Sequence, residues 1–170
     1  KWYEIDYATS SFGQGIAVTP LQMIMAVSSI ANGGKLMEPH VVKEVKLSDE
    51  NVVTIAPKMI RQIFKPEVAS ILSEMMVSAV DNGETRVLKP VGFRIAGKTG
   101  TAQITIAGHY DSNKTITSFV GFAPVDNPEF VMLVTLREPT SSPWGSETAA
   151  PIFFAIAREL FSYLSISPSG

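Results

Sequence analysis

Three β-favouring runs in the second half of the chain constrain its fold more than any other feature. They cover residues 93–106, 117–123 and 130–136 and are rich in β-branched and aromatic residues. The last two are joined by a proline-bounded linker, Pro124–Pro128, which is too short for the crossover that parallel strands require. The sequence therefore predicts an antiparallel sheet rather than an alternating parallel fold.

The first long helix is predicted from its end signals. Thr19 is a candidate N-cap, Pro20 occupies the first helical position, and Gln22 completes a capping box. The glycines after Asn32 end the helix in the left-handed conformation that glycine tolerates. Its expected apolar stripe consists of Leu21, Ile24, Met25, Ser28 and Ala31.

Two further helices are predicted from the helical spacing of apolar residues. One begins at Pro66 and ends at Asp81, and the other covers about residues 148–164, where Pro151 is tolerated only in the first turn. The expected buried face of the first consists of Val68, Ile71, Leu72, Met75, Met76, Ala79 and Val80. The expected face of the second consists of Phe153, Ile156, Ala157, Leu160, Phe161 and Leu164. The predicted class is α+β, with an antiparallel sheet covered by helices.

The remaining segments are expected to be peripheral. Residues 1–18 should form an irregular loop. The side chains expected to attach this loop to the core are Phe12, Ile16 and Val18. Residues 40–45 and 52–55 should pair as a hairpin around a turn at 48–51, and residues 165–170 should form a frayed tail.

Length and composition exclude several functional classes. The 170 residues suffice for one domain, and the absence of cysteine excludes thiolate chemistry, disulfides and cysteine-based zinc sites. A net charge of −2 gives no electrostatic footprint for nucleic acid. The longest apolar run, Ile152–Ala157, is far shorter than the ~20 residues of a membrane-spanning helix. Because the chain starts with Lys1 rather than Met, we expect a processed or truncated product that could have lost an anchor.

Residues Gly92–Gln103 concentrate the chemistry of the chain and admit two interpretations. The stretch Gly92–Thr99 matches the phosphate-binding pattern G-x-x-x-x-G-K-[ST]. That pattern requires a strand before it and a helix after it. Pro90 disfavours a central strand, and the residues after Thr99 favour a strand over a helix. A nucleotide-binding loop is therefore the disfavoured interpretation.

The other interpretation is a strand at a sheet edge. Period-two alternation places Thr99 and Thr101 on one face and Lys98 on the other. Gly97 and Gly100 lack side chains where another chain could approach. Such an edge can bind an extended peptide, and its backbone N–H groups can point at a developing oxyanion. The residues alone are equally compatible with a strand that has only a structural role and whose lysine is solvated.

Four stretches of the chain resemble class B penicillin-binding proteins, the bacterial D,D-transpeptidases that cross-link peptidoglycan. Lys98–Gln103 (KTGTAQ) is similar to the third motif of that family. The other similar stretches, in the family's order, are Ser11–Gln22 with Ala31–Gly34, Ser118–Pro124, and Ala149–Phe153. The resemblance is greatest to the division-type, septal subfamily. It implies that residues 1–170 are the C-terminal portion of a single transpeptidase domain.

The resemblance implies serine acyl transfer on D-Ala-D-Ala stem peptides, with β-lactams as mimics that stall as acyl-enzymes. Lys98 would support proton transfer, and the Thr101 N–H would form half of the oxyanion hole. The hydroxyls of Thr99 and Thr101 would bind the substrate carboxylate, with Gly100 between them in the substrate-binding strand. The expected catalytic residues are thus Lys98 and Thr101, and neither a metal nor a cofactor is implied.

The family also implies a setting for the protein. The parent protein would be membrane-anchored and act at the outer face of the bacterial cytoplasmic membrane. Its expected partners are peptidoglycan stem peptides, β-lactam antibiotics and the missing N-terminal half of the same domain, with cell-division proteins as further candidates.

The chain departs from the family pattern in its nucleophile. It contains no Ser-x-x-Lys and no Ser-x-Asn, since Ser112 and Asn113 lack the spacer. We therefore expect the nucleophile to lie outside this chain, and the chain alone to be inactive. The alternative is a catalytically inactive β-lactam-sensing or protein-interaction domain of the same fold.

Other polar residues are expected to be structural. His40 and His109 are isolated and lack metal-ligand spacing, and Arg94 beside the motif is expected to support the fold. Residues 104–116 could form a substrate-shaping loop that overhangs a cleft beside the Lys98–Gln103 strand.

Overall fold

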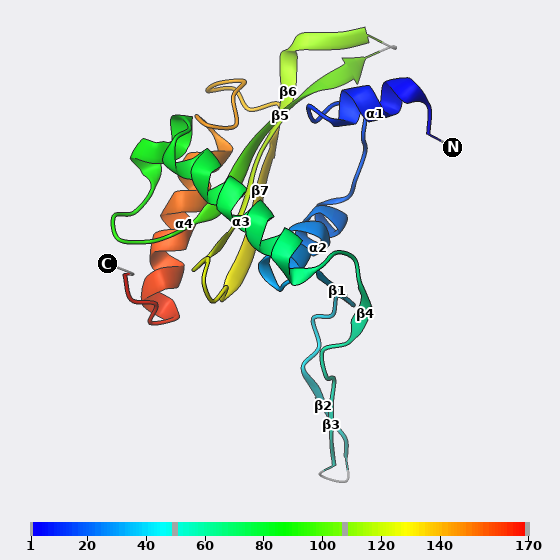
Figure 1. The fold of residues 1–170 in the computed structure, drawn as a ribbon, viewed down its shortest axis with the longest axis vertical. Helices are drawn as coiled ribbons and strands as arrows, with labels where there is room; N and C mark the ends of the chain where they lie inside the picture. The colour runs from blue at the N-terminus through cyan, green and yellow to red at the C-terminus, as the bar shows by residue number, and fades with distance from the viewer. Residues whose placement is uncertain (1, 49–50, 107–108, 169–170) are drawn as a thin grey trace.

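The centre of the molecule is the predicted antiparallel sheet. The structure, a computed structural model, describes residues 2–48, 51–106 and 109–168. The strands of this sheet are in the order β5-β6-β7, with β6 in the middle (Figure 1). The strands are β5 (Ala96–Ile106), β6 (His109–Ala123) and β7 (Phe130–Arg137). All pairings in this sheet are antiparallel, which confirms the prediction.

The outer half of the β5–β6 hairpin differs from the prediction. Residues 104–116, expected to form a loop, lie mostly in strands, and only residues 107–108 fall outside the described residues. The pairing register shifts between Gln103 and Ile104, and the ladder then continues from Ile104↔Asp111 to Ile106↔His109. The shift allows a bent ribbon to continue where composition suggested a loop.

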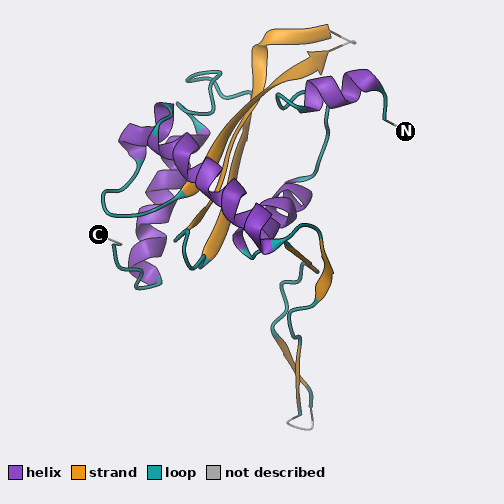
Figure 2. Ribbon diagram, viewed as in Figure 1, coloured by secondary structure: helices purple, strands orange, loops and turns teal. Residues whose placement is uncertain are grey.

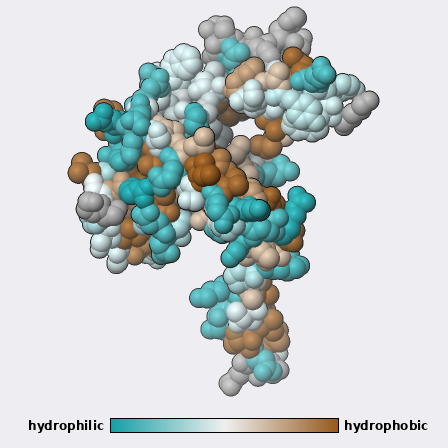
Figure 3. All heavy atoms as spheres, in the orientation of Figure 1, coloured by the Kyte–Doolittle hydropathy of each residue, from teal (hydrophilic) through white to brown (hydrophobic). Residues whose placement is uncertain are grey.

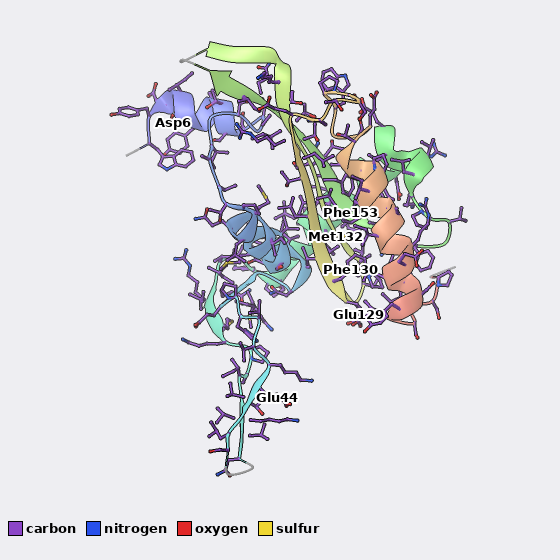
Figure 4. The ribbon with its side chains drawn as sticks, turned by 180° about the vertical axis from the view of Figure 1, so that it is seen from behind. Asp6, Glu44, Glu129, Phe130, Met132 and Phe153 are labelled. Atoms are coloured by element: carbon purple, nitrogen blue, oxygen red, sulfur yellow. The ribbon has the colours of Figure 1, made fainter. Side chains whose placement is uncertain are left out.

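Helices cover the sheet, as predicted, and they lie on both of its faces (Figure 2). They are α2 (Pro20–Ala31), α3 (Pro66–Asp81) and α4 (Ala149–Tyr163). Side chains of β6 alternate between the faces, so that Phe119 packs with Phe153 of α4 and Phe122 packs with Val77 of α3. Figure 4 shows Phe153 with Phe130 and Met132 of β7 between sheet and helix. This arrangement confirms the α+β class.

The helix starts follow the sequence signals closely. The Gln22 N–H donates to Thr19 Oγ1 at 3.2 Å, and the Thr19 N–H donates to Gln22 Oε1 at 2.8 Å, which completes the capping box. Pro151 lies in the first turn of α4, where a missing N–H costs nothing. Both predictions are confirmed.

The buried faces of the helices were predicted less well. In α3 the buried residues are Ala69, Ser73, Val77 and Val80. Val68, Ile71 and Met75, expected inside, are 42%, 60% and 63% exposed. Figure 3 shows the resulting apolar surface over the middle of α3.

The buried face of α2 was also predicted wrongly, whereas α4 differs less from its prediction. In α2 the buried residues are Val27 and Ser29, neither of which belongs to the expected stripe, and Leu21 of that stripe is exposed. In α4 the residues Phe153, Ala157 and Phe161 are buried as predicted, and Ile156 and Leu164 are partly exposed.

The N-terminal segment is partly helical, contrary to the prediction of a loop. Helix α1 (Glu4–Ser10) begins where Asp6 Oδ2 accepts the Tyr3 N–H at 2.8 Å. Phe12, expected to anchor the segment, is 69% exposed, and the neighbouring Ile16 and Val18 are also exposed.

A narrow arm projects from the body of the molecule (Figure 1). At its base β1 (Lys35–Met37) pairs with β4 (Met59–Gln62), and farther out β2 (Glu44–Lys46) pairs with β3 (Val52–Thr54). The outer pair is the predicted hairpin, shorter than expected; its turn includes residues 49–50, which lie outside the described residues.

Two segments complete the fold. A 3-10 helix, η1 (Glu84–Leu88), links α3 to β5. After α4 the chain folds back: the Ile166 N–H donates to Phe161 O at 2.9 Å, and Ile166 packs against the core, so residues 165–168 are not the expected frayed tail. Residues 169–170 lie outside the described residues. In the described chain, none of the helices has the length and apolar character needed to cross a membrane.

Candidate active site

The stretch that carries the K-T-G sequence is a strand at the edge of the sheet. β5 pairs with β6 on one side, and no strand of the described chain pairs with its other side. β5 continues as a strand through Thr99 to Ile106, so the helix required by a phosphate-binding loop is absent from this stretch. The nucleotide-binding interpretation is therefore wrong, and the edge-strand interpretation is confirmed.

The two glycines of the strand make room for β6 itself. A Cβ at Gly97 would lie 2.6 Å from Phe119 Cζ, and a Cβ at Gly100 would lie 2.4 Å from Ser118 Oγ. Phe119 is buried against α4, so its ring has no free space to move into. The glycines thus allow close packing within the sheet, in contrast to the expectation that they admit another chain.

Lys98 lies exposed on the strand, beside a hollow of about 260 Å³. Its ammonium donates to Thr99 O at 3.0 Å and to Thr99 Oγ1 at 3.2 Å. The lysine side chain therefore reaches along the strand edge although alternation places the two side chains on opposite faces. The hollow is lined by Lys98, Gly97, Thr99, Phe119, Ala79, Gly83, Glu84 and Thr85.

Thr101 holds a segment that lies far from it in sequence. The Gly145 N–H donates to Thr101 Oγ1 at 3.1 Å. Gly145 is buried, and it belongs to the connection between β7 and α4. Sequence reasoning missed this contact, because the only local signal was a glycine in a loop rich in proline and serine.

The structure places the predicted site residues together on one strand. Lys98 and Thr99 border the hollow, whereas Thr101 lies farther along the strand against the β7–α4 connection. Gly100 lies between them and faces Ser118. An ammonium group and two hydroxyl groups along an edge can bind an anion such as a carboxylate.

Two other residues considered in the sequence lie outside the candidate site: Arg94 stabilises the fold, and His40 lies on the surface. Arg94 donates to Glu74 Oε1 at 2.7 Å and to Asp126 Oδ1 at 2.5 Å, as a structural role predicts. The pKa of Arg94 is raised, first by its hydrogen bond to Glu74 and then by that to Asp126. His40 is exposed, with Nδ1 3.3 Å from Glu38 O. The side chain of His109 is outside the described part of the chain.

Comparison with known protein families gives a match over nearly the whole chain. Residues 1–158 match the model of the penicillin binding protein transpeptidase domain. Stage V sporulation protein D of Bacillus subtilis is 36% identical over 167 residues, covering 96% of this chain and 26% of that protein. A probable peptidoglycan D,D-transpeptidase PenA of Neisseria flavescens is 33% identical, covering 99% of this chain and 40% of that protein. The chain thus spans between a quarter and two fifths of these relatives.

Solved structures show the same fold. The transpeptidase domain of Burkholderia pseudomallei penicillin-binding protein 3 superposes with a TM-score of 0.78 at 30% identity, covering 99% of this chain and 49% of that one. Penicillin-binding protein 3 of Mycobacterium tuberculosis in complex with ampicillin superposes with a TM-score of 0.87 at 28% identity, covering 99% of this chain and 40% of that one. The fold, the edge strand and the match over residues 1–158 agree: this chain belongs to the penicillin-binding protein transpeptidase family.

Proposed function

We propose that this chain is the K-T-G-bearing, C-terminal portion of a peptidoglycan D,D-transpeptidase domain that β-lactams acylate. The observation that carries the proposal is the edge position of Lys98–Thr101, with Lys98 and Thr99 beside a hollow, in a chain of this family. An unpaired strand edge can bind an extended stem peptide through its backbone, and Lys98 supplies a positive charge beside it.

The names of relatives support the substrate and the inhibitors. Proteins called peptidoglycan D,D-transpeptidases occur among the relatives in Neisseria, and a homologue of one such enzyme occurs in Mesostigma viride. Penicillin-binding protein 3 of Mycobacterium tuberculosis has been solved with ampicillin and with aztreonam. We carry the stem-peptide substrate and β-lactam binding over to this chain on that basis.

In the proposed reaction, a serine hydroxyl attacks the carbonyl carbon of the penultimate D-Ala. The amide bond to the terminal D-Ala breaks, and D-Ala leaves as an amine that has taken up a proton. An amine of a neighbouring stem peptide then attacks the acyl-serine ester and restores the serine hydroxyl. Lys98 assists proton transfer and offsets the substrate carboxylate, which Thr99 and Thr101 bind, while the Thr101 N–H stabilises the oxyanion.

The serine of this reaction is proposed to lie in another part of the same domain. No serine of this chain has a lysine three positions later, and the chain covers 49% of the Burkholderia transpeptidase domain. The proposal places the domain at the outer face of the bacterial cytoplasmic membrane and favours a septal, division-type role, in keeping with the FtsI names among the relatives.

Fluorescent penicillin labelling tests this proposal. The longer protein that contains a Ser-x-x-Lys segment should form a covalent adduct, and residues 1–170 alone should form none. Lys98→Ala in the longer protein should slow acylation by at least ~100-fold, since it removes a charge from the transition-state environment. Lys43→Ala, an exposed lysine on the arm, is the matched control and should acylate normally.

Two outcomes would contradict the proposal. One is labelling of the isolated 170 residues, and the other is near-normal acylation of the Lys98→Ala protein with an unchanged circular dichroism spectrum. Reversible penicillin binding without an adduct, in the longer protein, would support the alternative of a β-lactam-sensing or interaction domain.

A further inference from the structure

The connection between β7 and α4 is fastened to the K-T-G strand at one residue, Gly145. Both backbone groups of Gly145 are bonded: its N–H donates to Thr101 Oγ1 at 3.1 Å, and its carbonyl accepts the Ala150 N–H of α4 at 2.9 Å. Gly145 is therefore fixed between the first turn of α4, whose inner face is buried, and the candidate substrate-binding strand.

Threonines of β6 and the start of α4 hold the rest of this connection. Thr115 Oγ1 donates to Pro143 O at 3.0 Å. Thr148 Oγ1 donates to Trp144 O at 2.7 Å and lies 2.9 Å from Thr117 Oγ1, which is also buried. Since the hydroxyl of Thr148 has one proton and gives it to the carbonyl, it accepts the proton of Thr117. Hydrogen bonds from β6 and from the start of α4 both hold this connection, so the sheet and α4 together set the position of the Gly145 N–H.

Only glycine fits at this point. A Cβ at Gly145 would lie 2.5 Å from Gly100 O and 2.9 Å from Ser118 O. Both are backbone atoms of paired strands and cannot move without disturbing the β5–β6 ladder. A side chain at position 145 would therefore push the connection away from β5 and lengthen the bond to Thr101.

The hydrogen bond from the Gly145 N–H determines the direction in which the Thr101 hydroxyl donates its own proton. A hydroxyl has one proton to donate and can accept two hydrogen bonds. An N–H that donates into Oγ1 occupies one acceptor position and repels the hydroxyl proton, which then points away from Gly145. The hydroxyl is thus oriented as a donor toward another acceptor, and a substrate carboxylate is an acceptor without a proton to give.

We propose that Gly145 is a positioning residue that orients the Thr101 hydroxyl as a donor to the substrate carboxylate. This inference rests on the proposed function of Thr101 and extends it to a residue 44 positions away in sequence. Gly145 does not touch the reacting atoms; it acts through Thr101.

The test compares two ligands in the full-length parent protein: benzylpenicillin, which carries a carboxylate, and its methyl ester, which does not. Gly145→Ala should slow acylation by benzylpenicillin roughly ten-fold or more, since hydrogen bonds to charged groups are among the stronger ones. Acylation by the ester should change less than about two-fold. Ser142→Ala, which removes the acceptor of the Trp144 N–H in the same connection, is the matched control and should leave both rates unchanged.

A double-mutant cycle separates positioning from general damage. In a Thr101→Val background, Gly145→Ala should cause no further loss with benzylpenicillin. Equal losses for both ligands, or multiplicative losses in the cycle, would overturn the inference. Normal acylation by Thr101→Val itself would instead overturn the proposed role of Thr101, so the two failures are distinguishable.

Amide hydrogen exchange covers the case in which Gly145→Ala does not fold. The Gly145 amide should be protected in the wild-type protein and in Thr101→Ser, which keeps the hydroxyl, and should exchange at least about ten times faster in Thr101→Val. Thr101→Ser should also retain most of the benzylpenicillin acylation rate. Unchanged exchange in Thr101→Val would contradict the inference without any substitution at Gly145.

Discussion

The residues without side chains shape the candidate site as much as those with functional groups. Gly97 accommodates the ring of Phe119, Gly100 accommodates the hydroxyl of Ser118, and Gly145 lies against the backbone of both strands. The first two contacts bring β5 close to β6, and the third brings the β7–α4 connection close to both strands. The placement of Lys98 and Thr101 relative to these neighbours therefore depends on three positions that carry no chemistry of their own.

The contact between Gly97 and Phe119 leads to a stability prediction. Gly97→Ala should lower the free energy of unfolding by about 1–3 kcal/mol, because the new methyl group overpacks a ring that is 1% exposed. Gly100→Ala is the matched control and should cost less, since the Ser118 hydroxyl can rotate away. Thermal or urea unfolding measures both. Equal stability of the Gly97→Ala and wild-type proteins would show that the ring can move.

Among the elements, the projecting arm is the one least supported by packing. Every residue of β2, β3 and β4 is exposed, and a two-stranded ribbon is only marginally stable in water. At its base, Glu38 accepts a hydrogen bond from Lys58 at 2.7 Å beside the backbone bond from the Glu38 N–H to Lys58 O. This pair joins the two strands where the arm meets the body.

The ion pair at the base of the arm predicts a shifted titration. The hydrogen bond from Lys58, and then its charge, lower the pKa of Glu38 from its ordinary value. The interaction is therefore present above the ordinary carboxyl pKa and is lost as the pH falls through the lowered value. Lys58→Ala should raise the pKa of Glu38 toward its ordinary value in an NMR titration. An unchanged Glu38 titration in that variant would show that the pair does not form in solution.

On the scale of the whole molecule, Arg94 connects three parts that are distant in sequence. It lies just before β5 and pairs with Glu74 of α3 and with Asp126 in the β6–β7 loop. The side chain of Arg94 is 37% exposed and those of its partners are more exposed, so solvent screens both pairs. The pairs nevertheless fix α3 relative to the start of the candidate site strand.

Replacement of Arg94 tests this connection. Arg94→Met should lower the free energy of unfolding by about 1 kcal/mol at low salt, with a smaller difference at ~1 M salt because exposed ion pairs are screened. Since its pKa is raised, Arg94 remains charged below the ordinary guanidinium pKa, and its contribution is lost only as the pH rises through the raised value. Denaturant unfolding at two salt concentrations measures the effect. A loss that does not depend on salt would point to lost packing of the side-chain stem.

Local chemistry alone determined the helix starts, the class of the fold and the strand character of the K-T-G stretch. Thr19 and Gln22 interact three positions apart, so their capping box could be predicted from spacing. The strand after Thr99 was predictable because β-favouring residues and a glycine exclude a stable helix there. The family resemblance of the K-T-G stretch has the same local basis.

Only the tertiary structure decided which surfaces are buried. Helix α3 packs on both β5 and α2, and in this setting the small residues Ala69 and Ser73 are buried while the larger Ile71 and Met75 remain exposed. Helical spacing marks two adjacent faces as apolar and cannot choose between them, because that choice depends on what the rest of the fold places opposite. The contact of Gly145 with Thr101 has the same origin. It bridges 44 positions and arises only once β7 and α4 have been brought against the edge strand.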